Sequence, residues 1–188
     1  MATTVQTNLN GVNVDTLVQT IQAIQGNPDL AKFTFRSQTK WINGGHSTTM
    51  IQSFHGAGAE DASRAKPFVI EGDEPPVLLG ENYGANAVES VLQALASCLA
   101  VGFIYNASAQ GIKVDSLDFW LEGELDLHPF LGLSDKIRPG YNKVSVNYSI
   151  KSNAPREKSE ALCDYVQATS PVLDILRNPV PVTVNMAD

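Results

Sequence analysis

The 188-residue sequence is short of the residue types on which several classes of protein depend. It contains only two cysteines, Cys98 and Cys163, and one pair cannot build the disulfide framework of a small secreted domain. The histidines, His46, His55 and His128, are too scattered to give, with those cysteines, the ligand spacing of a zinc site. We therefore expect two free thiols, no metal site and no cofactor.

Basic residues are also few, because 13 Lys and Arg face 20 Asp and Glu, and the net charge is −7. Such an acidic surface disfavours nucleic acid and anionic membranes, whose phosphate groups repel it. The longest nearly apolar run, Ala94–Tyr105, has about a dozen residues, whereas a membrane-spanning helix needs about 20. The polar N-terminus shows no secretory signal. We expect a cytoplasmic protein that has no nucleic-acid or membrane partner.

The apolar residues that are present make up 43% of the chain, which is enough to build one core at this length. Near the N-terminus, apolar residues recur at helical spacing between Asp15 and Gly26. These two residues suit the two ends of a short amphipathic helix. We predict that residues 1–31 form an N-terminal helical extension and that residues 32–188 form the main domain.

The main domain begins with a change of period from helical to alternating. Alternation over Lys32–Trp41 predicts a strand, and a turn at residues 43–45 leads to a second strand at His46–His55. Small and polar residues at 56–66 predict a loop, and Phe68–Glu71 predicts a further short strand.

The most distinct element is a long helix over Asn86–Gln110. Asn86 and Glu89 have the spacing of a capping box, and Gly111 stands where a left-handed C-terminal cap is favoured. The middle of this helix is apolar nearly all round, so it must be buried on several sides. A single sheet covers only one side, and the economical source of further cover is a second copy of the chain. We therefore predict a homodimer.

The C-terminal half contains two strongly alternating strands, Leu117–Leu127 and Lys143–Lys151, which we predict to be antiparallel neighbours. Helices are predicted from Pro155 to about Thr169 and from Ser170 to about Arg177, and a strand is predicted at Val180–Met186. The strands and helices do not alternate strictly. The predicted fold class is α+β, with a largely antiparallel sheet around a central helix.

Cys98 lies in the middle of the long helix, where a lone cysteine usually packs as a small hydrophobic residue. It is some three turns from the helix start, so the helix dipole cannot activate it there. A reactive thiolate at Cys98 would need side chains from other elements.

Two segments, NAVESVLQALASCLAVGFIYNASAQGI at residues 86–112 and TSPVLDILRNPVPV at residues 169–182, resemble the OsmC/Ohr family of osmotically inducible and organic-hydroperoxide-resistance proteins. The resemblance extends over about residues 32–186. It implies an intertwined homodimer in which each subunit wraps a sheet around a long helix. It also implies that Cys98 attacks a small organic hydroperoxide and that an external thiol reductant completes the cycle.

The family's second cysteine, which resolves the oxidised first one as a disulfide, directly precedes a proline, and here that position is Ser170. Serine suits a helix N-cap but cannot form a disulfide. Cys163, roughly two helical turns earlier, is a candidate resolving residue. The alternatives are a small thiol, another protein, or Cys98 of the second subunit.

The resemblance also assigns catalytic roles to charged residues. A family glutamate near the helix start pairs with an arginine that holds the reactive cysteine, and Glu89 matches it, although the capping box explains Glu89 equally well. The family arginine follows two glycines, where this sequence has His46, either a weaker cation or a turn residue. Arg36 on the first strand is another candidate cation, or else a solvated charge.

Three hypotheses follow for function. The first is thiol-dependent reduction of organic hydroperoxides through Cys98, impaired by Ser170. The alternative is a non-catalytic dimer that binds a small apolar ligand beside the long helix, with Cys98 serving as packing. The third is a hot-dog-type thioesterase or dehydratase, for which Glu89 is the one candidate carboxylate.

Overall fold

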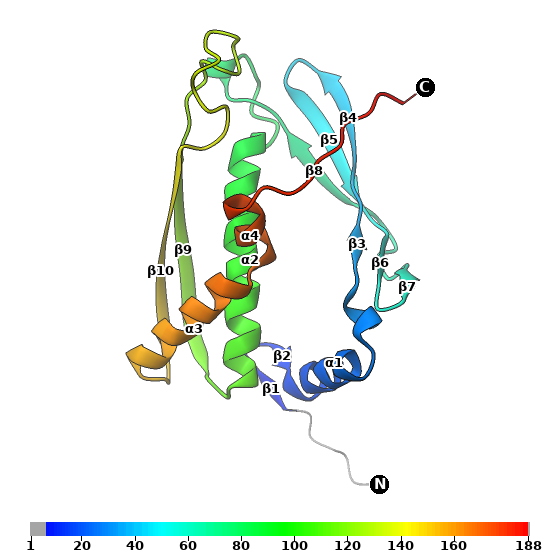
Figure 1. Ribbon diagram of the computed structural model, residues 1–188, viewed down its shortest axis with the longest axis vertical. Helices are drawn as coiled ribbons and strands as arrows, with labels where there is room; N and C mark the ends of the chain where they lie inside the picture. Colours follow the sequence, from blue (N-terminus) through cyan, green and yellow to red (C-terminus); the bar gives the residue numbers. More distant parts are fainter. Residues whose placement is uncertain (1–6, 188) are drawn as a thin grey trace. The chain divides into compact units, whose positions relative to one another are not determined.

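The computed structural model describes residues 7–187, which form two compact units (Figure 1). Residues 7–14 and 92–187 make up the core unit, and residues 15–91 make up the sheet unit. The boundary falls inside the long helix α2, Ala87–Ala109, near its first turns. The mixed helices and antiparallel sheets confirm the predicted α+β class with a long central helix.

The core unit is built on α2 and on the antiparallel pair β9, Val114–Glu124, and β10, Lys143–Ser152, which run beside the helix in Figure 1. The two strands pair as predicted, and Lys143 lies opposite Glu124. Alternate side chains of both strands pack on the core, whereas Trp120 faces outward. The buried hydrophobic residues of the core are Leu95, Leu99, Phe103, Ala107, Ile112, Leu162 and Val166.

The ends of α2 form as the sequence predicts. The Asn86 backbone N–H donates to Glu89 Oε2 at 2.9 Å, and the Glu89 N–H donates to Asn86 Oδ1 at 2.8 Å, which completes the capping box. Gly111 has a φ of +71°, the left-handed conformation expected at the other end.

The length of α2, 23 residues, and a mean hydropathy of 1.8 over its most apolar window meet the usual criteria for a membrane span. The nearly apolar run at residues 94–105, by contrast, is too short by itself to predict a membrane span. α2 carries four of the seven buried hydrophobic residues found in the described part of the chain, so one face of it lies in the core. The rest of its apolar surface is at least partly exposed, since only 17% of its most apolar window is buried.

A short hairpin that the sequence analysis did not predict connects the start of the chain to the far end of α2. Its strands are β1, Asn8–Leu9, and β2, Val12–Asn13, and Asn10 takes a positive φ of 53° between them. The Asn10 amide donates to Ser108 Oγ at 3.0 Å and to the Ile112 carbonyl at 2.8 Å, and its oxygen accepts from the Val114 N–H at 2.8 Å.

Two helices follow β10: α3, Arg156–Thr169, and α4, Pro171–Arg177, both close to their predicted bounds. The strand predicted at Val180–Met186 is wrong, because residues 179–187 have no regular structure. Alternation alone does not make a strand, which also needs a hydrogen-bonding neighbour. No strand in the described part of the chain pairs with this segment, and Val184 and Met186 are 89% and 95% exposed.

The sheet unit begins with α1, Val14–Gly26, which confirms the predicted amphipathic helix, and with the 3-10 turn η1, Pro28–Ala31. Two three-stranded antiparallel sheets follow, in the orders β4–β5–β8 and β3–β6–β7. Their strands are β3 Thr34–Phe35, β4 Gln38–Asn43, β5 His46–Ile51, β6 Phe54–Gly56, β7 Ala59–Asp61 and β8 Phe68–Gly72. A second 3-10 turn, η2, covers Pro76–Leu78.

Three predictions for this unit need correction. The single strand predicted at His46–His55 is broken at residues 52–53, and its parts β5 and β6 belong to different sheets. The single strand predicted at Lys32–Trp41 is broken at residues 36–37, and its halves β3 and β4 belong to different sheets. The loop predicted at 56–66 contains β7, because Ala57 and Gly58, with φ of 51° and 82°, form a tight hairpin turn.

Candidate active site

The sulfur of Cys98 lies 3.2 Å from the hydroxyl oxygen of Ser170, within the core unit. Cys98 is half-buried on α2, and Ser170 joins α3 to α4. The Ser170 side chain is well shielded, since the residue is only 6% exposed. A thiol that solvent can partly reach is therefore in contact with a buried hydroxyl.

The hydroxyl of Ser170 is held in place by the start of α4. Its Oγ accepts a hydrogen bond from the Leu173 backbone N–H at 3.2 Å, and Pro171 occupies the first helical position. The predicted N-cap role of Ser170 is thus confirmed. A hydroxyl that accepts from the backbone still has its own hydrogen to donate. When Cys98 is a thiolate, the sulfur carries no hydrogen, so Ser170 is the donor of the pair.

A close crossing of α2 and α3 brings these two residues together. A Cβ atom added to Gly102 would lie 3.1 Å from Val166 Cγ1, so glycine allows the helices to approach closely there. Gly102 is one turn after Cys98, and Val166 is one turn before Ser170. Starting from the contact between Cys98 and Ser170, the contact between Gly102 and Val166 lies toward the C-terminus of α2 and toward the N-terminus of α3. The two helices therefore run in opposite directions where they cross.

Cys163 contacts a different set of side chains. The Gln167 amide donates to its sulfur at 3.7 Å, and Tyr148 on β10 shares a hydrogen bond with it. Burial raises the pKa of Tyr148 to about 12, and the contact with Cys163 and the nearby carboxylates of Glu160 and Asp164 add to this effect. Along α3, Cys163 lies about 10 Å from Ser170 at 1.5 Å per residue.

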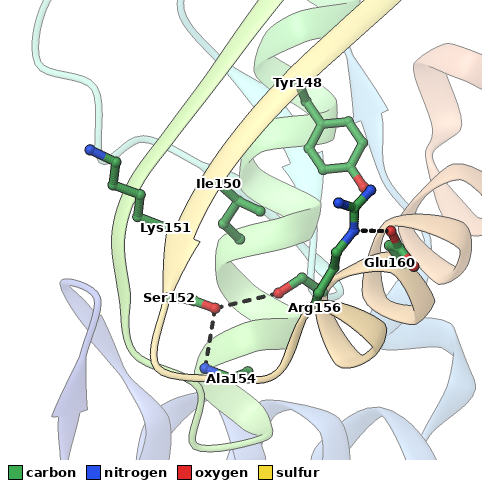
Figure 2. Close-up of a pocket in the computed structure, with 8 residues that line it drawn as sticks. Tyr148, Ile150, Lys151, Ser152, Ala154, Arg156 and Glu160 are labelled. Atoms are coloured by element: carbon green, nitrogen blue, oxygen red, sulfur yellow. Dashed lines mark hydrogen bonds and ion pairs between the residues drawn. The ribbon is translucent and has the colours of Figure 1, made fainter.

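A cavity of about 590 Å³ opens between the end of β10 and the start of α3 (Figure 2). Arg156 Nε pairs with Glu160 Oε1 at 2.7 Å, and in Figure 2 the Arg156 guanidinium and the Tyr148 hydroxyl point toward one another. Neither Cys98 nor Ser170 lines this cavity. Its lining residues are Tyr148, Ile150, Lys151, Ser152, Ala154, Arg156, Ser159 and Glu160.

The three charged candidates from the sequence lie in the sheet unit. The Glu89 carboxylate closes the capping box at the start of α2 and is exposed. Arg36 makes a bidentate ion pair with Glu60, at 2.8 and 3.0 Å, on the surface.

His46 is the least exposed of these candidates, because its ring stacks on Tyr83 with the centroids 4.5 Å apart. Its Nε2 lies 2.8 Å from Glu71 Oε2, which also accepts from the Thr48 hydroxyl at 2.8 Å. The hydrogen bonds from His46 and Thr48 hold the pKa of Glu71 below its ordinary value. Sequence reasoning did not find this cluster, since Glu71 is 25 residues from His46.

Buried Asp73 lies close to this cluster and is 4% exposed. Burial pushes the pKa of Asp73 upward, but backbone N–H donors from Glu81, Glu74 and Tyr83 outweigh it and hold the pKa below its ordinary value. Within residues 7–187, no group of three or more His, Cys, Asp or Glu side chains is arranged to hold a metal ion.

Comparison with protein families gives a match over residues 80–185 to the model described as OsmC-like protein. That segment is more than half of the chain and includes Cys98 and Ser170. Comparison with curated proteins gives no significant match.

Solved structures share the fold at low sequence identity. An OsmC-like protein from Mycoplasma pneumoniae has a TM-score of 0.57 at 16% identity, over 78% of this chain and 89% of its own. An OsmC-like protein of unknown function from Vibrio cholerae has a TM-score of 0.54 at 12% identity, over 75% and 92%. An organic hydroperoxide resistance protein from Legionella pneumophila has a TM-score of 0.53 at 17% identity, over 77% and 89%.

Proposed function

The chain belongs to the OsmC-like family, and from that premise we propose that it protects the cytosol against oxidative stress by reducing organic hydroperoxides at Cys98. The observation that carries the proposal is the pairing of a half-buried thiol with a buried, backbone-held hydroxyl 3.2 Å away. The structural neighbour from Legionella pneumophila, named an organic hydroperoxide resistance protein, supports the choice of substrate.

The reaction needs one nucleophile and one leaving group. The Cys98 thiolate attacks the outer oxygen of the hydroperoxide R–O–OH, the O–O bond breaks, and the alkoxide leaves and takes up a proton as the alcohol. The sulfur is oxidised to a sulfenic acid, and the hydroperoxide is reduced. A half-buried position suits this step, because the substrate must reach the sulfur while bulk water is partly excluded.

The oxidised cysteine must then be returned to the thiol. Ser170 cannot form a disulfide, and Cys163 lies about two turns along α3, against Tyr148 and Gln167. We assign Cys163 no part in resolution, because its sulfur already contacts the Gln167 amide and the Tyr148 hydroxyl. In our proposal an external low-molecular-mass thiol condenses with the sulfenic acid and releases water. A second thiol then displaces Cys98 as the free thiol.

A homodimer is part of the proposal. On the core helix, Val101 and Tyr105 are 53% and 48% exposed although the helix is apolar nearly all round. A second copy of the chain would cover these side chains. Light scattering at micromolar protein concentration should give twice the mass of one chain, and a monomer would exclude this part of the proposal.

The test of function compares cysteine variants in a hydroperoxide-consumption assay with excess small thiol as reductant. Cys98→Ser should abolish consumption. Cys163→Ser should retain it, because our mechanism gives Cys163 no role in resolution. Equal consumption by wild type and Cys98→Ser would exclude peroxidase chemistry and would favour binding of a small apolar ligand.

A further inference from the structure

The Ser170 hydroxyl has one contact that the backbone fixes and one that depends on the state of Cys98. The fixed contact is the N–H of Leu173, which occupies one lone pair of Oγ and so holds the oxygen in place. The second contact is the Cys98 sulfur at 3.2 Å. The hydroxyl hydrogen can turn toward that sulfur without any movement of the oxygen.

The surroundings of this pair strengthen such a hydrogen bond. Ser170 is 6% exposed, and a hydrogen bond to a charged group is stronger where water is excluded. The start of α2 cannot take over this role, because Cys98 lies some three turns beyond it and the effect of a helix terminus decays within one turn.

We infer that Ser170 is a positioning residue for the proposed hydroperoxide reduction: its hydroxyl donates a hydrogen bond to the Cys98 thiolate, stabilises the charge and orients the sulfur. The inference rests on the proposed function and deepens it. Ser170 thus makes two hydrogen bonds through one hydroxyl: the oxygen accepts from the backbone at the start of α4, and the hydrogen is donated to the Cys98 thiolate.

A measurement on the thiol alone separates this inference from the peroxidase proposal. In a Cys163→Ala background, only Cys98 reacts with iodoacetamide, and the alkylation rate is followed from about pH 5 to pH 10 because only the thiolate reacts. Ser170→Ala should slow alkylation at pH 7 by about tenfold, the size expected for one hydrogen bond to a charged group, and move the profile to higher pH.

Two further variants distinguish donation from helix capping. Glycine caps a helix nearly as well as serine, whereas alanine does not, and neither has a hydroxyl. Ser170→Gly and Ser170→Ala should therefore share one alkylation profile while differing in stability. Ser170→Thr keeps the hydroxyl and should restore the wild-type profile. Circular dichroism confirms that each variant is folded.

A wild-type profile in folded Ser170→Ala or Ser170→Gly would overturn the inference. So would a folded Ser170→Thr variant whose profile matches that of Ser170→Ala. If the profile shifts as expected but the wild type consumes no hydroperoxide, the proposed function fails while the hydrogen bond to the thiolate stands.

Discussion

A Cβ atom on Gly102 of α2 would lie only 3.1 Å from Val166 Cγ1 of α3, so this pair sets how closely the two helices approach. The contact lies one turn from both Cys98 and Ser170. The distance between the thiol and the hydroxyl thus depends on a glycine that has no chemical role of its own.

Gly102→Ala should lower the free energy of unfolding by about 1 kcal/mol. The better helix propensity of alanine, about 1 kcal/mol, is outweighed by overpacking against Val166, which costs about 1–3 kcal/mol. In a Val166→Ala background the same change should be neutral or stabilising, because the contact is gone. Urea denaturation of the four proteins measures this coupling, and strictly additive effects would contradict the account of the crossing.

Ser170→Cys should turn the protein into a two-cysteine enzyme. The side-chain atoms of positions 98 and 170 are 3.2 Å apart, and a disulfide of about 2.05 Å requires only a small movement. We expect one equivalent of organic hydroperoxide to give a disulfide between positions 98 and 170, reducible by a dithiol. Peptide mapping without reductant, in a Cys163→Ser background, detects it. Persistence of a sulfenic acid at Cys98 would show that the two positions are not in contact.

Asn10→Ala should destabilise the core unit by about 2–4 kcal/mol. The change removes the hydrogen bonds of the Asn10 side chain with Ser108, Ile112 and Val114, and it places alanine at a positive φ of 53°. Asn10→Gly loses the same hydrogen bonds but tolerates the positive φ, so it should be less destabilising. Thermal unfolding compares the two variants. Equal losses would show that backbone strain makes no contribution.

Acid should destabilise the sheet unit through Asp73. Its folded-state pKa lies below the ordinary value of 3.8, so the stability that it contributes is present above about pH 4 and is lost as the pH falls through the folded-state value. Asp73→Asn should lower stability at pH 7 and flatten the loss of stability below pH 4. Asp135→Asn, at an exposed aspartate, is the matched control. The experiment is urea denaturation from about pH 2 to pH 7, and an unchanged pH dependence in Asp73→Asn would contradict the assignment.

Local patterns predicted the elements whose determinants lie close together in the sequence. Asn86 and Glu89, which form the two reciprocal hydrogen bonds of the capping box, are only three residues apart in the sequence. The alternation of apolar and polar residues in β9 and β10 identifies which side chains face the core. The hydrogen bonds of the Asn10 side chain could not be predicted in this way, because its partners lie about 100 residues away and no local sequence pattern indicates them.

The candidate site was predicted less completely. Helix periodicity and capping signals locate Cys98 on α2 and Ser170 at the start of α4, but the 72 residues between them leave their contact undetermined without the family resemblance. The strand expected at Val180–Met186 failed for a related reason, since alternation describes one strand and says nothing about whether a neighbour is present to pair with it.

The most direct test of the central claim is mass spectrometry of the fully reduced protein after one equivalent of an organic hydroperoxide, with a sulfenic-acid trap present. Peptide analysis reads each cysteine separately. Our account predicts rapid adduct formation on Cys98, slower formation in Ser170→Ala, and none on Cys163. If Cys98 in the wild type is trapped no faster than a free cysteine peptide, the account is contradicted.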